Sequence, residues 1–329
     1  MATIKDVAER VGVSVTTVSR VLNNRGYLSE DLKRRVYQAM EELNYQPNEL
    51  ARSLFRKKSN IIGLIIPDIS HPFFGEIAIH AESYAYKKGY KILLCNSRLN
   101  KSKEKEYINM LKASQVDGII MGSHTLDTKE YNSINLPIVT IDRQLSDSIP
   151  YVSSDHYKGG ELATKLLIQR GCKKIAHISG NLKLHLLAKT RYDGFMDTVT
   201  KFQIPHVVVE TDLNGFKYEE YEQIVTDLFR EHPDLDGIFA SSDIIAAQVL
   251  KECRRIGKRV PEDVKVVGFD GIRVGEYITP ELTTIQQPIK DIAKTAVKLL
   301  IDQINGTEVP RENILPVKLI EKETTLGNE

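Results

Sequence analysis

The sequence predicts an all-α helix-turn-helix headpiece with a short hinge helix, joined to an α/β core of two doubly wound, parallel-sheet lobes. Three observations predict this arrangement. Apolar residues recur at helical spacing through the first 46 positions, and a short basic segment follows them. From residue 61 onward, short apolar runs alternate with helical stretches. The predicted divisions of the chain are residues 1–46, 47–59 and 60–329.

The first 23 residues have the pattern of two short helices separated by a tight turn. Thr3 can cap the first helix, with Asp6 three residues later to complete a capping box, and Gly12 ends it. Ser14 can cap the second helix. The two helices would bury a shared apolar face that consists of Ile4, Val7, Ala8, Val11, Val13, Val18, Val21 and Leu22.

The other face of the second predicted helix carries small hydroxyl side chains and one guanidinium. Its residues are Val15, Thr16, Thr17, Ser19 and Arg20. Side chains of this kind suit a helix that enters the major groove of DNA and contacts base edges. Any short amphipathic hairpin of helices also buries one face and exposes the other, so the bare pattern leaves a structural interpretation open.

A third helix is expected to complete the headpiece. Ser29 can cap it, and Glu30 and Asp31 place two acids at its N-terminus, where the helix dipole favours negative charge. Its apolar face is Leu32, Val36, Met40 and Leu43. Three short helices in about 45 residues are enough for a minimal core.

Residues 47–59 form a basic linker with about two turns of potential helix, too short to be stable alone in water. Asn48 can cap it, and Leu54 projects from the same face as Ala51. Basic residues around one leucine suit folding in the minor groove of DNA, where a leucine can separate a base step. Without the preceding helices, the same segment would be interpreted as a solvated linker.

The charge distribution supports contact between the N-terminal end and phosphate. Residues 1–60 hold 11 Lys and Arg against 7 Asp and Glu, a balance of +4. The whole chain is only +1, so residues 61–329 sum to −3. A basic headpiece on a slightly acidic body is expected of a protein that binds nucleic acid at one end.

Composition and cysteine usage exclude several classes of protein. Cys95, Cys172 and Cys253 are odd in number and far apart, which predicts buried free thiols in a reducing compartment. The first ten residues are charged and lack the pattern of a signal peptide. The longest apolar run, residues 61–67, is too short to span a bilayer. We expect a cytoplasmic protein with no membrane contact and no metal or cofactor.

The common phosphate- and zinc-binding motifs of enzymes do not occur in the sequence. No GxGxxG follows the first predicted strand, no GxxxxGK[ST] is present, and the eight histidines form no HExxH pair. We therefore expect no catalytic residues and no enzymatic activity.

From residue 61 onward the sequence alternates between strands and helices. The first set of predicted strands is IIGLIIP, KILLC, GIIMG and PIVTID, and the second is KIAHIS, HVVVE, DGIFAS and VKVVGFD. The predicted helices lie near residues 75–88, 102–115, 185–201, 217–231 and 243–256. Apolar strands spaced by helices predict parallel sheets covered on both faces. A ligand is expected where the carboxyl ends of the two sets of strands meet.

The chain resembles the LacI family of transcriptional repressors along its whole length. The headpiece resemblance rests on IKDVAERVGVSVTTVSRVLN and the hinge resemblance on YQPNELARSL. The core resembles periplasmic ribose-binding proteins through GLIIPDISHPFF, QVDGIIM, PIVTIDR, RYDGF, IFASSD, VVGFDG and LTTIQQP. Within the family, ARSLFRKKSNIIGLIIPDISHPFF and PYVSSDHY are most similar to ribose operon repressors of Gram-positive bacteria. The resemblance implies an N-lobe of about residues 60–160 and 288–318, and a C-lobe of about residues 161–287 and 319–329.

The resemblance implies DNA contacts for individual headpiece residues. Val15, Thr16 and Arg20 occupy base-reading positions, and Arg20 is the expected bidentate partner of a guanine. Phosphate contacts are implied for Thr3, Ser14, Thr17 and Asn48. Leu54, on the same face as Ala51, matches the leucine that enters a central pyrimidine–purine step. Two headpieces of a dimer would bind a pseudo-palindromic operator.

The resemblance also implies an effector site between the lobes. Phe73 and Phe74 would sandwich a sugar ring. The groups that would bind its hydroxyls are Asp142, Arg143, Arg191, Asp270 and Gln287, the last on a crossover between the lobes. His71 and Ser242 stand where ribose-binding sites carry Asn, so ribose is the first expectation and other sugars stay open. A titrating His71 would make sugar affinity depend on pH.

The function implied is a dimeric repressor of a sugar-utilisation operon that a small sugar, first of all ribose, releases from DNA. Sucrose or a hexose as effector, a corepressing sugar, and a global catabolite regulator with a phosphocarrier protein as corepressor are the alternatives. A transport-associated sugar-binding protein would share the core but lack residues 1–60. The C-terminal sequence ETTLGNE has no leucine heptads, which favours a dimer over a tetramer.

Overall fold

The computed structural model describes residues 2–23, 25–46, 58–123, 125–126, 128–182, 186–211 and 218–326. The chain forms two compact units, residues 1–59 and 60–329, and each is described by itself. The predicted DNA contacts Asn48, Ala51 and Leu54 lie outside the described residues.

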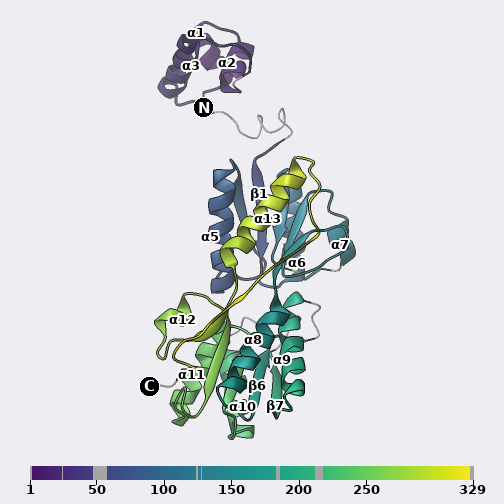
Figure 1. The fold of residues 1–329 in the computed structure, drawn as a ribbon. Coiled ribbons are helices and arrows are strands. Elements are labelled where there is room, and N and C mark those ends of the chain that lie inside the picture. Colours follow the sequence, from purple (N-terminus) through teal and green to yellow (C-terminus); the bar gives the residue numbers. More distant parts are fainter. Residues whose placement is uncertain are drawn as a thin grey trace. The chain divides into compact units, whose positions relative to one another are not determined.

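The headpiece consists of the three predicted helices, α1 (Ile4–Val11), α2 (Val15–Leu22) and α3 (Glu30–Glu42) (Figure 1). The caps form as predicted. The Thr3 backbone N–H donates to the Asp6 carboxylate at 2.7 Å, and Ser14 Oγ accepts from the Thr17 N–H at 3.1 Å. Gly12 ends α1 in the left-handed conformation, with φ 74°.

The three helices pack through small apolar residues and two long-range polar contacts. Val7, Val18 and Val36 are fully buried at the centre of this core. Arg10 pairs with Glu42 at 2.8 Å, and Arg35 Nη2 donates to the Val11 carbonyl at 2.6 Å. Both contacts join α1 to α3, and α2 packs with Val18 and Val21 buried and Val15 and Thr16 exposed.

One half of the core, which includes β11 from near the end of the chain, builds a six-stranded parallel sheet in the order β11-β5-β4-β3-β1-β2. Its strands are β1 (Ile61–Ile66), β2 (Lys91–Asn96), β3 (Gly118–Met121), β4 (Ile138–Ile141), β5 (Tyr151–Ser154) and β11 (Glu312–Leu315). One face packs against α5 (Pro72–Lys87) and α13 (Ile289–Ile304). The other face packs against α6 (Lys101–Ala113) and α7 (Thr128–Asn132). We call this part the N-lobe (Figure 1).

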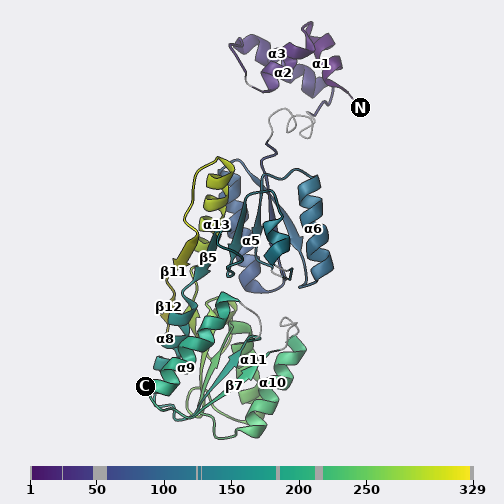
Figure 2. The same ribbon diagram turned by 90° about the vertical axis from the view of Figure 1, so that its right-hand side faces the viewer.

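The second half, the C-lobe, builds a sheet in the order β12-β10-β9-β8-β6-β7, parallel except for β12 against β10. The strands are β6 (Ile175–Ser179), β7 (His206–Glu210), β8 (Gly237–Ala240), β9 (Lys265–Asp270), β10 (Thr283–Gln286) and β12 (Lys318–Ile320). One face packs against α8 (His156–Gln169) and α9 (Thr190–Lys201). The other packs against α10 (Tyr218–Glu231) and α11 (Asp243–Ile256), so each sheet is doubly wound (Figure 2). Two short elements, the 3-10 helix η1 (Leu187–Lys189) and α12 (Val274–Tyr277), complete the lobe.

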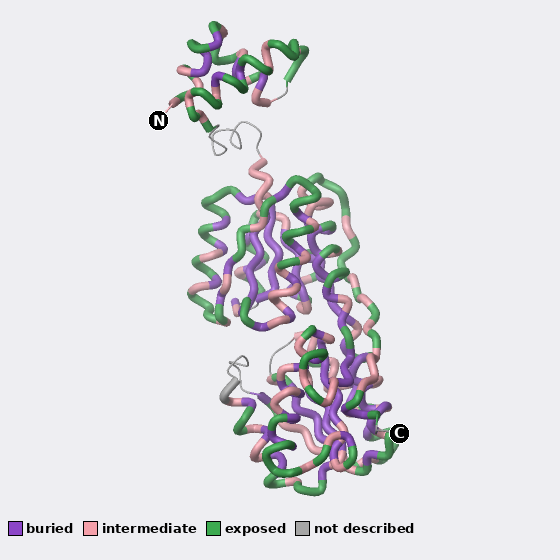
Figure 3. Tube along the Cα trace, turned by 90° about the vertical axis from the view of Figure 1, so that its left-hand side faces the viewer, coloured by how far each residue is buried: buried purple, intermediate pink, exposed green. Residues whose placement is uncertain are grey.

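The chain passes between the lobes three times. The passages lie between β5 and α8, between β10 and α13, and between β11 and β12. Burial follows the two sheets, whose central strands are buried along their length while the outer helix faces are exposed (Figure 3). The first two passages start close to the carboxyl ends of the buried strands β5 and β10, so polar residues there are presented to both lobes.

The sequence did not predict α8, α13 or the three short strands β10, β11 and β12 as elements. The cysteines are buried free thiols, as predicted, and burial raises the pKa of each of them. Across the described ranges, no helix has both the length and the apolar composition that a bilayer crossing requires.

Candidate effector site and DNA-binding surface

The outward face of α2 presents the predicted recognition residues to solvent. Val15 is 38% exposed, and Thr16 and Arg20 are also exposed. Ser14 and Thr17 share a hydroxyl–hydroxyl hydrogen bond of 2.9 Å at the N-terminus of the helix. This surface has the polar side chains, the positive charge and the helix terminus that contacts to DNA require.

The guanidinium of Arg20 lies over the turn that follows α2. Gly26 in this turn has φ +79°, and a Cβ atom at its position would lie 2.5 Å from Arg20 Nη2. A side chain at position 26 would therefore both strain the backbone and displace the guanidinium.

In the core, two predicted carboxylates occupy matching positions in the two lobes. Asp142 directly follows β4, and Asp270 is the last residue of β9, each strand being third in its sheet. Both residues have left-handed backbone conformations, with φ 57° and 109°. Non-glycine residues in this region are uncommon and often mark functional positions.

A chain of polar contacts joins Asp142 to Arg191. Asp142 Oδ1 accepts from Ser153 Oγ at 2.8 Å and lies 3.0 Å from His156 Nε2. The other ring nitrogen, His156 Nδ1, accepts from Arg191 Nε at 3.1 Å. His156 is buried, and it connects an aspartate of the N-lobe to an arginine of the C-lobe.

Three further contacts fix the guanidinium of Arg191. Its Nη1 donates to the Ser241 carbonyl at 2.6 Å, and its plane lies over the Phe269 ring, 3.7 Å from the ring centroid. Its Nη2 lies 3.9 Å from Asp270 Oδ1. A guanidinium held in this way offers its remaining N–H groups in a fixed direction, as recognition of a hydroxyl pair requires.

Two glycines allow α8 and α9 to approach closely enough for this arrangement. A Cβ atom at Gly160 would collide with the carbonyl oxygen of Arg191, and one at Gly194 would collide with the carbonyl of Tyr157. The absence of side chains at these positions therefore sets the distance of Arg191 from His156.

Asp270 is held by the second passage between the lobes. Gln287 Nε2 donates to its Oδ1 at 2.7 Å, and the Gln287 backbone N–H donates to its carbonyl at 3.0 Å. Asp243 supports the turn that follows, because its carboxylate accepts from the Ile272 N–H at 2.9 Å and from Thr284 Oγ1 at 2.5 Å.

The two matching carboxylates ionise differently. Burial alone would raise the pKa of Asp142, but His156, Arg191 and Ser153 together lower it below its usual value. Burial raises the pKa of Asp270 to about 7, although Arg191 and Gln287 oppose this rise and Asp142 and Glu76 add to it. Two acids of the N-lobe therefore contribute to the raised pKa of an acid of the C-lobe.

The predicted aromatic residues do not all face the same way. Phe73 is buried in the core between the N-lobe sheet and α5, whereas Phe74 is half-buried. His71, the N-cap of α5, lies edge-on to Phe74 at 5.8 Å between ring centroids. Burial lowers the pKa of His71 to about 4, so the ring is neutral near pH 7. The expected pH dependence through His71 therefore lies far below physiological pH.

Ser242 and Arg143 take part in local structure. Ser242 Oγ caps α11 by accepting from the Ile245 N–H at 3.3 Å. Arg143 is half-buried, and its carbonyl accepts from Thr140 Oγ1. The contacts described above link Asp142, Arg191, Asp270 and Gln287 into one site, and none of them runs through the Ser242 or Arg143 side chain.

Sequence reasoning missed two residues of this site, His156 and Asp243. β5 ends at Ser154, and His156 is the second residue after it, whereas Asp142 is the first residue after β4. Polar residues at the carboxyl ends of parallel strands are the signal that could have identified it.

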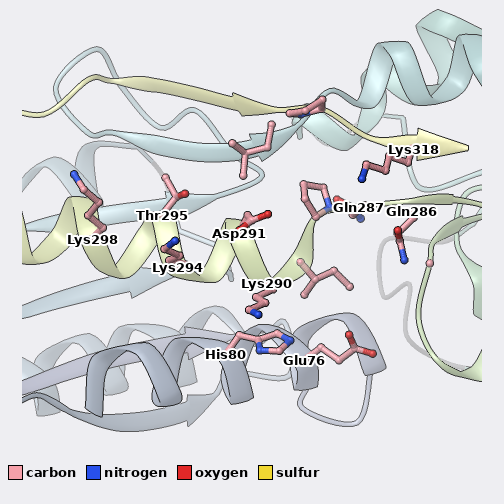
Figure 4. Close-up of a pocket in the computed structure, with 15 residues that line it drawn as sticks. Glu76, His80, Gln286, Gln287, Lys290, Asp291, Lys294, Thr295, Lys298 and Lys318 are labelled. Atoms are coloured by element: carbon pink, nitrogen blue, oxygen red, sulfur yellow. The ribbon is translucent and has the colours of Figure 1, made fainter. Parts of the chain in front are cut away.

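A separate groove of about 720 Å³ runs beside α13 (Figure 4). Glu76 and His80 of α5 line one side, and Lys290, Lys294 and Lys298 of α13 line another. It shares only Gln287 with the predicted effector residues. We place the candidate effector site at the bonded chain from Asp142 to Gln287, because charged groups of both lobes converge there.

Comparison with known families matches both units of the chain. Residues 3–48 match the family model of bacterial regulatory proteins of the lacI family, and residues 164–325 match the periplasmic binding protein-like domain. The ribose operon repressor of Halalkalibacterium halodurans is 44% identical, over 100% of this chain and 98% of that protein. The sucrose operon repressor of Streptococcus mutans is 42% identical, over 98% of this chain and 99% of that protein.

Solved structures agree with these matches. The lac repressor dimer bound to operator and the anti-inducer ONPF aligns with a TM-score of 0.88 at 28% identity, over 99% of both chains. A periplasmic binding protein/LacI regulator of Alkaliphilus metalliredigens complexed with D-xylulofuranose aligns with a TM-score of 0.74 at 37% identity. This alignment covers 82% of this chain and 100% of the Alkaliphilus chain.

Proposed function

The chain belongs to the LacI family of bacterial regulatory proteins, and on that premise we propose that it is a dimeric repressor of a sugar-utilisation operon. Its α2 helices would read a pseudo-palindromic operator, and a small sugar bound between the lobes would release the DNA. Ribose is the first candidate effector, because a 44% identical relative over the full chain is a ribose operon repressor.

The observation that carries this proposal is the bonded chain of Asp142, His156, Arg191, Asp270 and Gln287 between the lobes. A pentose presents adjacent hydroxyls that can donate to a carboxylate or accept from a guanidinium. Such a site rejects an analogue that lacks a hydroxyl, because a buried charged group is then left without its partner.

A sugar that contacts both lobes would favour one lobe arrangement over the other. Every tenfold loss of operator affinity requires about 1.4 kcal/mol of difference in sugar binding between the two arrangements. We propose that the change of lobe arrangement acts on residues 47–59, where Asn48, Ala51 and Leu54 would contact DNA. In the opposite response the sugar acts as corepressor. It would bind the same site but favour the lobe arrangement that binds DNA.

An exposed apolar surface on the N-lobe supports the dimer. Ile79 and Tyr86 of α5 are 65% and 72% exposed, and Leu93 and Leu94 of the edge strand β2 are also exposed. The helix and the strand are in contact with each other. Apolar side chains gathered at a sheet edge are typical of an interface between copies of a chain.

The test is fluorescence anisotropy of a labelled pseudo-palindromic duplex with a central CG step, at fixed salt. We expect tight binding without sugar and release by millimolar ribose, with no release by glucose. Two variants separate the sites. Arg20→Ala is expected to lose operator binding and keep sugar binding, whereas Arg191→Gln is expected to bind operator and resist release. Tight DNA binding that no sugar alters would contradict the effector part of the proposal.

Two other effectors are favoured by specific relatives and belong in the same titration. D-Xylulose is included because the 37% identical Alkaliphilus regulator is complexed with D-xylulofuranose. Sucrose is included because the 42% identical Streptococcus protein is a sucrose operon repressor. Release by one of these and not by ribose would change the effector and leave the repressor proposal intact.

A further inference from the structure

A single buried imidazole joins the two lobes at the candidate effector site. His156 is the first residue of α8 and is 2% exposed. Its Nε2 lies 3.0 Å from Asp142 Oδ1, and its Nδ1 lies 3.1 Å from Arg191 Nε. Asp142 follows a strand of the N-lobe sheet, and Arg191 belongs to α9 of the C-lobe. The ring therefore forms a direct polar link between the lobes.

Only one protonation state of the ring satisfies both partners. An ionised Asp142 carboxylate can only accept a hydrogen bond, so His156 Nε2 must donate. The Arg191 guanidinium has only N–H groups, so His156 Nδ1 must accept. A protonated ring would point its Nδ1–H at the Arg191 N–H. Burial and the Arg191 charge lower the pKa of His156, and Asp142 and Asp155 oppose this without reversing it.

The link controls the edge of Arg191 whose C-lobe partner, His156, is itself bonded to the N-lobe. The C-lobe fixes Nη1 through the Ser241 carbonyl and the guanidinium plane through Phe269. Its Nε depends on His156, whose ring orientation depends in turn on Asp142. A movement of Asp142 with the N-lobe would therefore turn the guanidinium with respect to Asp270.

We propose that His156 is a positioning residue of the effector site. Because its Nε2 donates to Asp142 and its Nδ1 accepts from Arg191, the ring orients the Arg191 guanidinium toward the sugar. That orientation then depends on the position of Asp142. The inference rests on the proposed function, because the sugar is the ligand that Arg191 would bind. A sugar that contacts Asp142 and Arg191 together favours the lobe arrangement in which this bridge is intact. The bridge thus links sugar affinity to lobe geometry.

The first test uses calorimetric titration of the full chain with D-ribose. A glutamine carries one donor and one acceptor, as the neutral ring does, so His156→Gln is expected to stay within about threefold of the parent affinity. His156→Leu cannot bridge and is expected to bind at least tenfold more weakly. His177→Gln is the matched control, because His177 is also fully buried but contacts the Phe239 carbonyl, and it is expected to bind like the parent. Equal loss in the Gln and Leu variants, or no loss in either, would overturn the proposal.

The second test needs no sugar and separates this inference from the proposed function. Imidazole nitrogen NMR of the full chain with labelled histidine reports which ring nitrogen carries the proton, and His156 is assigned by its absence in the Gln variant. We expect a neutral Nε2–H ring at pH 7 and a loss of that preference in Asp142→Asn. A proton on Nδ1, or a charged ring, would refute the bridge. If the parent binds none of ribose, D-xylulose and sucrose, the effector part of the proposed function fails, and this NMR result alone decides about His156.

Discussion

The N-lobe and the C-lobe each present one aspartate at the carboxyl end of the third strand of their sheet, and the two differ in charge. Asp142 and Asp270 share a left-handed backbone conformation and a place in the strand order. Asp142 is surrounded by donors, and its pKa is lowered. Asp270 has Gln287 as its hydrogen-bond donor and Arg191 at 3.9 Å, and burial raises its pKa.

The two aspartates hold equivalent positions in their lobes, so the difference between their pKa values comes from the groups around them and not from their place in the fold. The N-lobe supplies an acceptor whose pKa lies below its usual value, whereas the C-lobe supplies a carboxyl group whose pKa is about 7. A sugar hydroxyl that donates to Asp270 would favour the ionised form, because only the carboxylate has both oxygens free to accept. Sugar binding is therefore expected to release a proton from the C-lobe and none from the N-lobe.

The largest expected effect is the asymmetry between two matched substitutions. At pH 6, Asp142→Asn is expected to weaken sugar binding by about 10- to 100-fold, because a charged hydrogen-bond acceptor is lost. Asp270→Asn is expected to change it only slightly at the same pH, because Asp270 is already largely protonated. At pH 8 both variants should be weakened. Calorimetric titration at the two pH values measures the sugar affinity of each variant. Equal losses of affinity in the two variants at pH 6 would contradict the difference between the two aspartates.

The second effect is the pH dependence of sugar affinity in the unmodified protein. Affinity is expected to rise as the pH increases from 6 to 8, by at most tenfold per pH unit below the pKa of Asp270, which is about 7. Asp270→Asn should flatten the profile. A titration in buffers of different ionisation enthalpy would also detect the released proton. A profile that stays steep in the variant would assign the proton to another group.

The third effect is on stability and has opposite signs in the two lobes. The raised pKa of Asp270 means that the folded chain holds a proton that the unfolded chain releases above about pH 4. Folding stability should therefore fall as pH rises from 4 to 7, by on the order of 1 kcal/mol per pH unit for this group. Asp142, with its lowered pKa, stabilises the fold above its unfolded-state pKa and loses that contribution as pH falls.

Urea unfolding of the parent and Asp270→Asn across this range measures the C-lobe contribution. The variant should show a shallower fall in stability with rising pH. The pKa of Asp243 is also raised well above its usual value, so Asp243 should contribute to the fall of stability with rising pH in both proteins. A variant with the parent's slope would mean that Asp270 is ionised in the folded, unliganded protein.

The helix caps of the headpiece could be predicted from sequence in detail because their contacts are local. Thr3 with Asp6 and Ser14 with Thr17 lie three residues apart, so the sequence itself displays the pairs. The effector site is different, because Arg191 meets His156 from 35 residues away and Ile272 meets Asp243 from 29. The family resemblance identified Asp142, Arg191, Asp270 and Gln287, but it gave no reason to select the residues that hold them.

The missed elements have physical reasons as well. The short strands β10, β11 and β12 contain only three or four residues each, and the last two have no buried residue, so no apolar run marks them. The helix α8 contains Gly159 and Gly160, which weaken a helical pattern in the sequence. Gly160 is explained by close contact with α9, which only the folded chain displays. What the sequence could not predict is therefore largely what joins the lobes.

The smallest expected effect is that of a His71 substitution on the pH dependence of sugar affinity, which we assign to Asp270. From sequence, protonation of His71 was expected to couple sugar affinity to pH, but burial lowers its pKa to about 4. His71→Asn should therefore leave the shape of the affinity profile between pH 6 and 8 unchanged, with at most a uniform shift of a few fold. The same calorimetric series measures it, with Asp270→Asn as the matched variant that does flatten the profile. If His71→Asn removed the pH dependence instead, the titrating group would belong to the N-lobe, and the contrast between the two lobes would be reversed.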